Sequence, residues 1–268
     1  MEKQYNNSIG RRIIMIRDFS KETFDILIQA GQSNSDGTAF GNVYDPYQQT
    51  PLVWYYNADG TFQVAQEKVT NNAIQSNFSL TFARKYVQSG MLTEGRKLLI
   101  LRTAVGGTGF SDNHWKSTDD LYLRMMEMIH DVLALNSENR LKALLWHQGE
   151  TDALNNMTYD YYREHITELI ANVRNTFDVP TLPFIAGDFV QDWKHKNADI
   201  SAPIISALRD VCANQNCAFV ETEGLDSNRE DGYPHPFGWS DDIHFCRRAI
   251  YELGERYFDA YTSIIMQN

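Results

Sequence analysis

Five short apolar runs, each followed by a polar or glycine-containing segment, constrain the fold of this 268-residue chain most strongly. Their apolarity is continuous rather than alternating, which is typical of strands that are buried on both faces, as in a parallel sheet. The runs are Phe24 to Ala30, Lys97 to Ala104, Leu141 to Trp146, Phe184 to Phe189, and Ala218 to Val220. The sequence therefore predicts a five-stranded parallel sheet.

Longer stretches with helical spacing lie between and after these runs. Apolar residues in them recur every three or four positions, so each can bury one face against a sheet. The stretches are 78–86, 121–132, 159–177, 200–212 and 243–261. Strands that alternate with helices predict a three-layer α/β/α sandwich with right-handed crossovers.

Composition narrows the class of protein. The chain is 43% hydrophobic and 22% charged, with a net charge of −11, and it has neither internal repeats nor low-complexity tracts. We expect one domain over residues 1–268, with residues 1–22 as an N-terminal extension. The negative charge disfavours nucleic acid and anionic membrane surfaces as partners. A polar N-terminus and three cysteines favour a cytoplasmic location over a secreted, disulfide-bonded one.

Two long segments, 35–74 and 227–242, show neither pattern and are predicted to be loops. Both are polar and rich in aromatic residues. Long loops in a compact α/β domain are usually functional, and aromatic rings in them can line a ligand site. The candidates for substrate binding are Gln32, Asn34, Trp54, Trp115, Tyr233 and Trp239.

Four polar clusters follow predicted strands or precede the last helix. They are residues 31–34, 105–108, 146–152 and 241–244. In an open parallel sheet, ligands bind at the carboxyl ends of the strands. The fold is therefore expected to bring these clusters to one edge of the sheet, although they are distant in sequence.

Together the clusters contain the groups that acyl transfer needs. Ser33 is the candidate nucleophile, and His244 is the base that would accept its proton. Asp241, three residues before His244, is placed to orient the imidazole and to stabilise its cation. The backbone N–H groups of Ser33 and Gly107, with the side-chain amide of Gln148, are candidate donors to the oxyanion.

The blocks Gly31-Gln32-Ser33-Asn34, Gly106-Gly107-Thr108, His147-Gln148-Gly149-Glu150 and Asp241-x-x-His244 resemble those of the SGNH hydrolase superfamily. The sequence is most similar to the sialate O-acetylesterase-like group, which includes acetylxylan esterases of carbohydrate esterase family six. Most SGNH enzymes have Asn in the third block, and this group has Gln.

The resemblance implies a flavodoxin-like fold and the same roles for Ser33, His244, Asp241, Gly107 and Gln148. Many relatives have Met after the first block, where this chain has Ser35-Asp36. Glu150 could share the orienting role of Asp241 or could brace its own loop.

Several residues also have simpler interpretations. His147, beside Trp146, is favoured as a structural histidine, and Cys212 and Cys217 as two small buried residues. Asp241, Asp242 and His244 could together bind Zn or Mn, but no further His or Cys has a suitable spacing. We therefore expect neither a metal nor a cofactor.

The leading hypothesis is a serine esterase that removes O-acetyl groups from small carbohydrates through an acetyl-Ser33 intermediate. Acetylated xylo-oligosaccharides are the first substrate to consider, and O-acetyl sialic acid is the second. The alternatives are a lipase or lysophospholipase on the same scaffold, and a non-catalytic sugar-binding protein. A lipid enzyme should have an apolar lid, whereas the loops after Ser35 and Ser227 are rich in Asn, Asp, Gly and Tyr.

Overall fold

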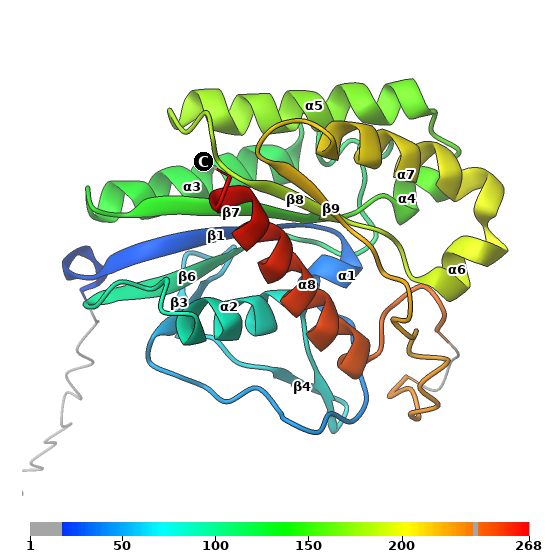
Figure 1. The fold of residues 1–268 in the computed structure, drawn as a ribbon, viewed down its shortest axis with the longest axis horizontal. Coiled ribbons are helices and arrows are strands. Elements are labelled where there is room, and N and C mark those ends of the chain that lie inside the picture. The colour runs from blue at the N-terminus through cyan, green and yellow to red at the C-terminus, as the bar shows by residue number, and fades with distance from the viewer. Residues whose placement is uncertain (1–17, 238–240, 268) are drawn as a thin grey trace, which may run out of the picture.

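The computed structural model describes residues 18–237 and 241–267. All five predicted strands form, and neighbours among them pair in parallel within one sheet (Figure 1). They are β1 (Thr23–Gly31), β6 (Arg96–Arg102), β7 (Arg140–His147), β8 (Phe184–Gly187) and β9 (Cys217–Val220). β1 lies in the middle and is buried along most of its length, as its continuous apolarity predicts.

Two further strands extend this sheet beyond the five predicted. β2 (Val53–Tyr56) pairs in parallel with β6, and β3 (Phe62–Val64) pairs antiparallel with β2, so the order is β3-β2-β6-β1-β7-β8-β9. The prediction that residues 35–74 form only a loop is therefore wrong. The run Val-Trp-Tyr-Tyr is short, but all four side chains are buried, and packing on the sheet stabilises it as a strand.

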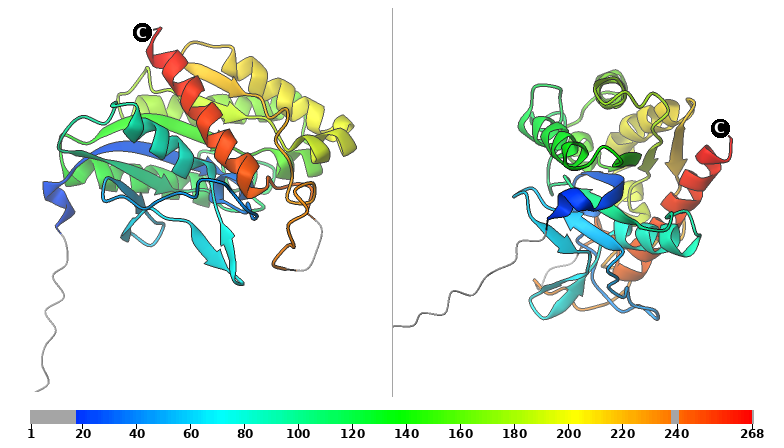
Figure 2. Two further views of the ribbon diagram at one scale, coloured as in Figure 1. Left: turned by 60° about the horizontal axis from the view of Figure 1, so that its bottom comes forward. Right: turned by 90° about the vertical axis from the view of Figure 1, so that its left-hand side faces the viewer.

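Helices cover both faces of the sheet, which confirms the predicted three-layer sandwich (Figures 1 and 2). α2 (Phe78–Gln88) and α8 (Arg247–Ile265) pack together on one face. α3 (Asp120–Leu135), α5 (Tyr159–Thr176) and α7 (Ala198–Cys212) lie on the other, where α5 contacts α7. Among the described residues, no helix is long and apolar enough to span a bilayer.

Short elements complete the described chain. They are the 3₁₀ turn Phe19–Lys21, α1 (Ser33–Asp36), α4 (Glu150–Leu154), α6 (Gln191–Lys196), and a separate hairpin of β4 (Lys68–Thr70) and β5 (Ala73–Gln75). α1 begins directly after β1, and α4 begins after the loop that follows β7. The carboxyl ends of these two central strands therefore lead into the short helices that bear Ser33 and Glu150.

The last helix begins later than its sequence pattern predicts. α8 starts at Arg247, and the Cys246 sulfur caps it by accepting a hydrogen bond from Ala249 N at 3.5 Å. Residues 241–244 instead form a turn, in which the Asp241 carboxylate accepts hydrogen bonds from Ile243 N and His244 N. Such an Asx turn competes with helix, which explains the delay.

Phe19, which falls within the predicted N-terminal extension 1–22, contacts aromatic residues of the domain. Phe19 stacks on Phe62 with ring centroids 4.0 Å apart and meets Trp54 edge-on at 5.3 Å. Phe19 is thus packed against the edge of the sheet. The basic and apolar stretch 12–17 lies outside the described residues.

One buried ion pair connects α8 to the long segment that lies between α1 and α2. The Arg247 guanidinium binds the Glu67 carboxylate through two nitrogens, at 2.8 and 2.5 Å, and Tyr251 donates to the same carboxylate at 2.7 Å. Two parallel N–H···O bonds of this kind are both strong and directional. The ion pair holds this segment against α8, the helix that follows His244.

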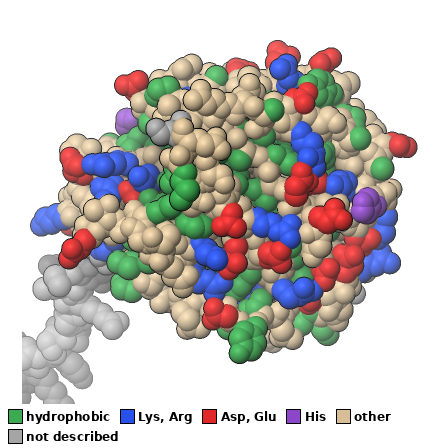
Figure 3. All heavy atoms as spheres, viewed as in Figure 1, with side chains coloured by type: hydrophobic (Ala, Val, Ile, Leu, Met, Phe, Trp, Pro, Cys, Tyr) green, Lys and Arg blue, Asp and Glu red, His purple; other side chains and the backbone are tan. Residues whose placement is uncertain are grey.

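The surface carries both signs of charge. On the face that includes α8, acidic and basic side chains are interspersed (Figure 3). The three cysteines are free thiols; Cys212 and Cys246 are buried, and Cys217 is partly buried.

Candidate active site

A sharp turn at the end of β1 presents Ser33. Gly31 has φ +122°, and a Cβ on it would lie 2.2 Å from the His147 carbonyl oxygen, so only glycine fits where β1 runs against β7. Gln32 then leads into α1, whose first residue is Ser33. The nucleophile candidate is therefore rigidly mounted at the carboxyl edge of the central strand.

Ser33, His244 and Asp241 form a continuous hydrogen-bonded chain. Ser33 Oγ lies 2.8 Å from His244 Nε2, and His244 Nδ1 lies 2.7 Å from Asp241 Oδ2. The structure thus brings together a hydroxyl and an imidazole that are 211 positions apart in the sequence. This is the geometry that a hydroxyl nucleophile, its base and an orienting carboxylate require.

Asp241 is held in this role by several donors. Besides the two N–H groups of its own turn, Asn228 Nδ2 donates to Asp241 Oδ2 at 3.0 Å. Burial acts to raise the pKa of Asp241, but the hydrogen bond and charge of His244 outweigh it, and the pKa is lowered. Asp241 is therefore an anion at neutral pH and favours the tautomer of His244 that has its proton on Nδ1.

Asn34 connects the nucleophile helix to the loop that bears His244. Its Nδ2 donates to Ile243 O at 2.9 Å and to Glu150 Oε1 at 2.8 Å, while its Oδ1 accepts from Phe245 N at 3.2 Å. These bonds use both amide hydrogens, and the residue is buried. Asn34, expected to bind substrate, is instead placed to position His244 relative to Ser33.

The backbone N–H groups of Ser33 and Gly107 are the predicted donors to the oxyanion. Within residues 18–237 and 241–267, neither Ser33 N nor Gly107 N donates to a protein acceptor. Gly107 is exposed, has φ +71° and has open space where a Cβ would lie, and a Cβ on Gly106 would come within 3.4 Å of Ser33 Cβ. The loop after β6 therefore approaches Ser33 closely, and its glycines leave room for a substrate.

Gln148 is fully buried, and both hydrogens of its side-chain amide are used inside the protein. Nε2 donates to Asp152 Oδ2 at 2.7 Å and to Thr108 O at 3.1 Å, and Oε1 accepts from Tyr162 OH at 3.0 Å. This geometry does not support the expectation that Gln148 donates to the oxyanion. Its amide instead binds the loop that contains Gly107.

Asp152 also binds the loop that contains Gly107, and we call the contacts that Gln148 and Asp152 make with this loop the clamp. Its carboxylate accepts from Ser111 N at 2.7 Å and from Phe110 N at 3.1 Å, and a Cβ on Gly109 would collide with it at 2.6 Å. Asp152 lies on α4, and the loop follows β6, so the clamp joins segments about 40 positions apart. It holds Gly107 in place against Ser33.

Glu150 lies beneath α1 and does not orient His244. Its Oε1 accepts from Asn34, and Oε2 has no hydrogen-bond partner among the described residues. Burial raises the pKa of Glu150, since hydrogen bonds and the charge of His244 offset only part of the cost of desolvation. Between the two carboxylates considered for orienting the imidazole, the structure places Asp241 there.

His147 is a buried neutral imidazole. Tyr257 OH donates its one hydrogen to Trp146 O at 2.7 Å, so it must accept from His147 Nδ1–H, 3.0 Å away. Nε2 is then an unprotonated nitrogen without a partner in the described chain. Burial lowers the pKa of His147 to about 3. These contacts agree with a structural role for this residue.

The buried His147 predicts a loss of stability in acid. The unfolded chain binds a proton on this imidazole below its ordinary pKa of about 6.5, whereas the folded protein does not until about 3. Stability therefore falls as pH falls through this window, and His147 alone lowers the free energy of unfolding by about 2 kcal/mol between pH 7 and pH 5.

Urea unfolding of the wild type and His147→Gln at both pH values measures this contribution. The variant should lose about 2 kcal/mol less than the wild type between pH 7 and pH 5. His130→Gln, which removes an exposed imidazole, is the matched control and should behave as the wild type. Equal pH dependence in wild type and His147→Gln would contradict the prediction.

The aromatic residues expected to bind substrate lie elsewhere or are covered. Trp54 is in β2, in register with Leu99 in the middle of β6, and packs on Phe19, which precedes β1, so it is remote from Ser33 beyond the carboxyl end of β1. Trp115 is fully buried beneath the loop after β6, where its Nε1 donates to Thr108 Oγ1 at 3.0 Å, so it cannot stack on a sugar. Tyr233 is partly buried in the segment after Asn228, and Trp239 lies outside the described residues.

The structure places two other aromatic residues near the triad. His235 Nε2 is 3.6 Å from Asp241 Oδ2, and the His235 ring packs edge-on against Phe40, which Phe237 also contacts. The Phe237 side chain is 50% exposed. Sequence reasoning did not single out either residue, because nothing local distinguishes them from the other aromatic residues of the segment.

Two projecting segments attach to the chain just after the helix that bears Ser33. Ala39 bridges Ser76 at the base of the β4–β5 hairpin, and Asn228 Nδ2 donates to Thr38 O at 3.1 Å. The hairpin and the 227–237 segment therefore attach to the stretch that follows α1, and both project on the same side of the molecule (Figures 1 and 2).

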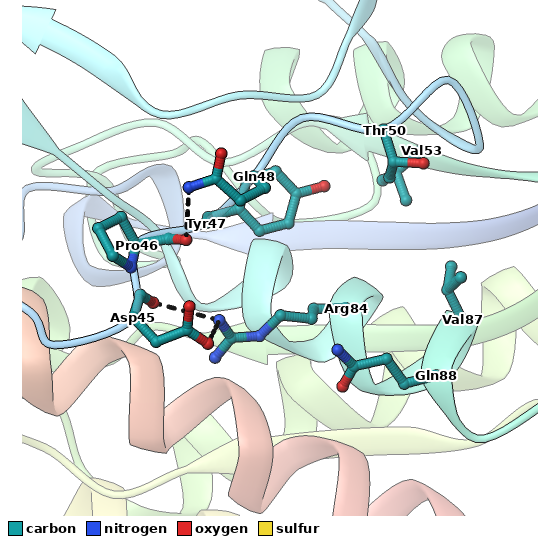
Figure 4. A pocket seen from close by; sticks show the side chains of 9 residues that line it. All are labelled: Asp45, Pro46, Tyr47, Gln48, Thr50, Val53, Arg84, Val87 and Gln88. Atoms are coloured by element: carbon teal, nitrogen blue, oxygen red, sulfur yellow. Dashed lines mark hydrogen bonds and ion pairs between the residues drawn. The ribbon is translucent and has the colours of Figure 1, made fainter.

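A separate hollow of about 280 Å³ lies between residues 45–53 and the last turn of α2 (Figure 4). Arg84 and Asp45 form an ion pair at 3.1 Å on one side of it. Val53, which lines it, is in register with Leu98 and hence with Asp25 near the start of β1. The hollow is thus at the amino ends of the strands and is not part of the site at Ser33.

The three residues considered as metal ligands do not converge. Asp241 binds His244, whereas the Asp242 carboxylate turns to Lys196 Nζ at 2.9 Å and to Arg229 at 3.5 Å. In the described part of the chain, no group of three His, Cys, Asp or Glu residues could hold a metal ion.

An α/β sandwich with a Ser–His–Asp chain at the carboxyl edge of its sheet defines a class, that of α/β hydrolytic enzymes acting on esters. The sequence profile of the carbohydrate esterase, sialic acid-specific acetylesterase family matches residues 23–263. The chain belongs to this family, which confirms the resemblance drawn from the four sequence blocks, and it is a carboxylic ester hydrolase.

Individual proteins are also similar to this chain in sequence or in fold. The chain is 24% identical to a probable carbohydrate esterase of Arabidopsis thaliana over 264 residues, which covers 89% of this chain and 90% of that protein. The crystal structure of NanS has a TM-score of 0.76 at 17% identity, covering 92% and 99% of the two chains. A carbohydrate acetylesterase from Xanthomonas citri has a TM-score of 0.54 at 16% identity, covering 91% and 57%. These two structural matches show that the fold is shared.

Proposed function

We propose that the protein removes O-acetyl groups from small carbohydrates through an acetyl-Ser33 intermediate. The observation that carries the proposal is the unbroken chain from Ser33 Oγ through His244 to Asp241, with distances of 2.8 and 2.7 Å. Membership in a family of carbohydrate acetylesterases supplies the substrate class. An intact chain of this kind also argues against a sugar-binding protein without activity.

In the first half-reaction Ser33 Oγ attacks the acetyl carbonyl carbon while His244 Nε2 takes the hydroxyl proton. The carbonyl π pair moves to oxygen, where the N–H groups of Ser33 and Gly107 stabilise the negative charge. When the tetrahedral intermediate collapses, the C–O bond to the sugar breaks and His244 delivers its proton to the leaving sugar oxygen. Asp241 stabilises the imidazolium between these steps.

In the second half-reaction water replaces the sugar. His244 accepts a proton from water as the water oxygen attacks the acetyl carbon of acetyl-Ser33. Collapse of the second intermediate breaks the bond to Ser33 Oγ, which regains its proton from His244, and acetate leaves. The free enzyme is restored without a cofactor or a metal in either half-reaction.

The family description supports a different ranking of substrates from that based on sequence alone. It names sialic acid, so we place O-acetyl sialic acid ahead of acetylated xylo-oligosaccharides. The rim of the site also has two cations, Lys196 and Arg229, close to Asp242, the residue next to Asp241. A sugar carboxylate could pair with them.

Release of acetate from a panel of acetylated sugars tests this proposal. We expect the highest kcat/KM for O-acetyl sialic acid, lower values for acetylated xylo-oligosaccharides, and a preference for acetyl over octanoyl nitrophenyl ester. Faster hydrolysis of the octanoyl ester would favour the lipase alternative. Absence of acetate release from every sugar, with purified folded protein, would contradict the proposed function.

A further inference from the structure

We propose that His235 is a positioning residue for the acyl transfer, whose ring Nε2–H stabilises the Asp241 carboxylate and so sets how readily His244 takes up a proton. The inference rests on the proposed function, because it concerns the base of the same reaction. It gives a role to the segment 229–237, which no step of the reaction otherwise uses.

The segment starts from the turn that bears the triad acid and base. Asn228 N donates to His244 O at 2.8 Å, and Arg229 N donates to Asp241 O at 2.7 Å. Ser227 forms an antiparallel bridge with Phe245 next to them. The beginning of the segment is therefore fixed to the backbone of Asp241 and His244.

His235 then returns to the carboxylate of Asp241. Its Nε2 is 3.6 Å from Asp241 Oδ2; the His235 side chain is only 8% exposed, and that of Asp241 is fully buried. The ring centroid lies 5.2 Å from that of Phe40 and 5.6 Å from that of Phe237. A covered imidazole thus faces a buried carboxylate, and electrostatic interactions are stronger there than in water.

The backbone of the segment fixes the tautomer of His235. Phe237 N donates to His235 Nδ1 at 3.3 Å. A backbone N–H can only donate, so Nδ1 is the unprotonated nitrogen and the neutral ring has its proton on Nε2. Burial lowers the pKa of His235; the charge of Asp241 opposes this shift, and that of His244 adds to it. The neutral ring therefore points its N–H toward Asp241.

Two donors already bind the oxygen that His235 faces. Asp241 Oδ2 accepts from His244 Nδ1 at 2.7 Å and from Asn228 Nδ2 at 3.0 Å. At 3.6 Å the His235 N–H is beyond hydrogen-bond distance and acts as an oriented dipole. Among the described residues, Asp241 and His244 are the titratable groups that act on the ring, and Phe40, which packs against it, has no charge.

The effect of this dipole on the base has one sign. Its positive end stabilises the Asp241 anion and weakens the attraction between Asp241 and a protonated His244. In acid, a proton on His235 adds a positive charge that acts in the same direction. Without the His235 N–H, His244 should be protonated at a higher pH, and a protonated His244 cannot accept the Ser33 proton.

The pH profile of kcat/KM on an acetyl nitrophenyl ester tests the inference. His235→Phe keeps a ring against Phe40 but has no N–H. We expect the midpoint of its acidic limb to rise by about half a pH unit, which lowers kcat/KM on the acidic side about threefold. His235→Gln keeps an N–H donor and should return the midpoint toward that of the wild type.

His130→Phe is the matched control. His130 also faces a carboxylate, with its Nδ1 3.8 Å from Asp131 Oδ1, but its side chain is 76% exposed on α3. This variant should keep the wild-type midpoint. Loss of packing alone in His235→Phe would lower Tm without moving the midpoint, so the pH profile distinguishes a positioning role from a structural one.

Nuclear magnetic resonance of the unmutated enzyme tests the contact without a substitution. In protein with ¹⁵N-labelled histidine, couplings between the ring nitrogens and the carbon-bound ring protons identify the tautomer. At neutral pH His235 should have its proton on Nε2 and His244 on Nδ1, so that two imidazoles of opposite tautomer face one carboxylate.

The outcomes separate this inference from the proposed function. A wild-type midpoint in His235→Phe, an equal shift in His235→Gln, or a proton on His235 Nδ1 would each overturn the role of His235 while leaving the esterase assignment intact. A wild-type protein that hydrolyses no ester would overturn the proposed function and this inference with it.

Discussion

Ser33→Ala is expected to lower kcat for acetyl ester hydrolysis on the order of a million-fold, the scale seen when the nucleophile of a serine hydrolase is removed. Without the hydroxyl, His244 has no proton to accept and no acyl-enzyme can form. Stability should change little, because among described groups Ser33 Oγ bonds only to His244, and one such bond contributes about 1 kcal/mol. Initial rates and thermal unfolding measure the two effects.

Ser35→Ala is the matched control for this substitution. Ser35 lies in the same short helix, is fully buried, and its Oγ has no hydrogen-bond partner among the described residues. Its removal should leave kcat and Tm near wild type. A serine-directed fluorophosphonate should label the wild type and Ser35→Ala but not Ser33→Ala. Substantial activity in Ser33→Ala would refute the nucleophile assignment. So would labelling of this variant at another serine, if that labelling abolished the activity.

Asp241→Asn is expected to lower kcat about 10⁴-fold with the fold retained. The asparagine oxygen can still accept from Ile243 N and His244 N. Its nitrogen would then face His244 Nδ1 and donate to it, which forces the imidazole proton onto Nε2. In that tautomer His244 donates toward Ser33 and cannot accept the hydroxyl proton.

Asp242→Asn provides the comparison. It removes a carboxylate next in sequence that pairs with Lys196 and Arg229 at the surface, where ion pairs contribute little. Its kcat for the neutral nitrophenyl ester should stay near wild type. If instead Asp241→Asn retains most activity and Glu150→Gln loses it, the orienting carboxylate is Glu150, contrary to the contacts described above.

The central strands could be predicted from sequence because their signal is local. Strands buried on both faces must be apolar at nearly every position, and β1, β6, β7, β8 and β9 each show this within a few residues. The four site blocks could also be predicted from sequence, because polar residues directly after such strands have to lie at the carboxyl edge of the sheet.

The edge strands could not be predicted in this way. β2 is a run of four residues within a polar segment, and it forms because β6 offers backbone partners and a surface for Trp54 and Tyr55. The same pairing places Trp54 opposite Leu99 in the middle of β6, away from the carboxyl edge of the sheet. An aromatic residue in an apparent loop was therefore assigned to the site although the sheet buries it elsewhere.

The roles of the amides were also beyond local reasoning. Gln32, Asn34 and Gln148 are side chains of similar chemistry in adjacent blocks, and each was a candidate to contact substrate. Which hydrogens remain free depends on acceptors from other segments, such as Thr108 O for Gln148 and Ile243 O for Asn34. Hydrogen-bond partners that are far apart in sequence leave no local pattern.

By itself the sequence determined the layered α/β architecture, the edge of the sheet where chemistry can occur, and the set of residues able to carry it, because burial and strand ends impose patterns on neighbouring positions. Only the tertiary structure decided that Asp241 rather than Glu150 meets His244, and that the Gln148 amide binds Thr108 O and Asp152. Those choices depend on ångström distances between segments that fold together from opposite ends of the chain, and such distances are set by packing.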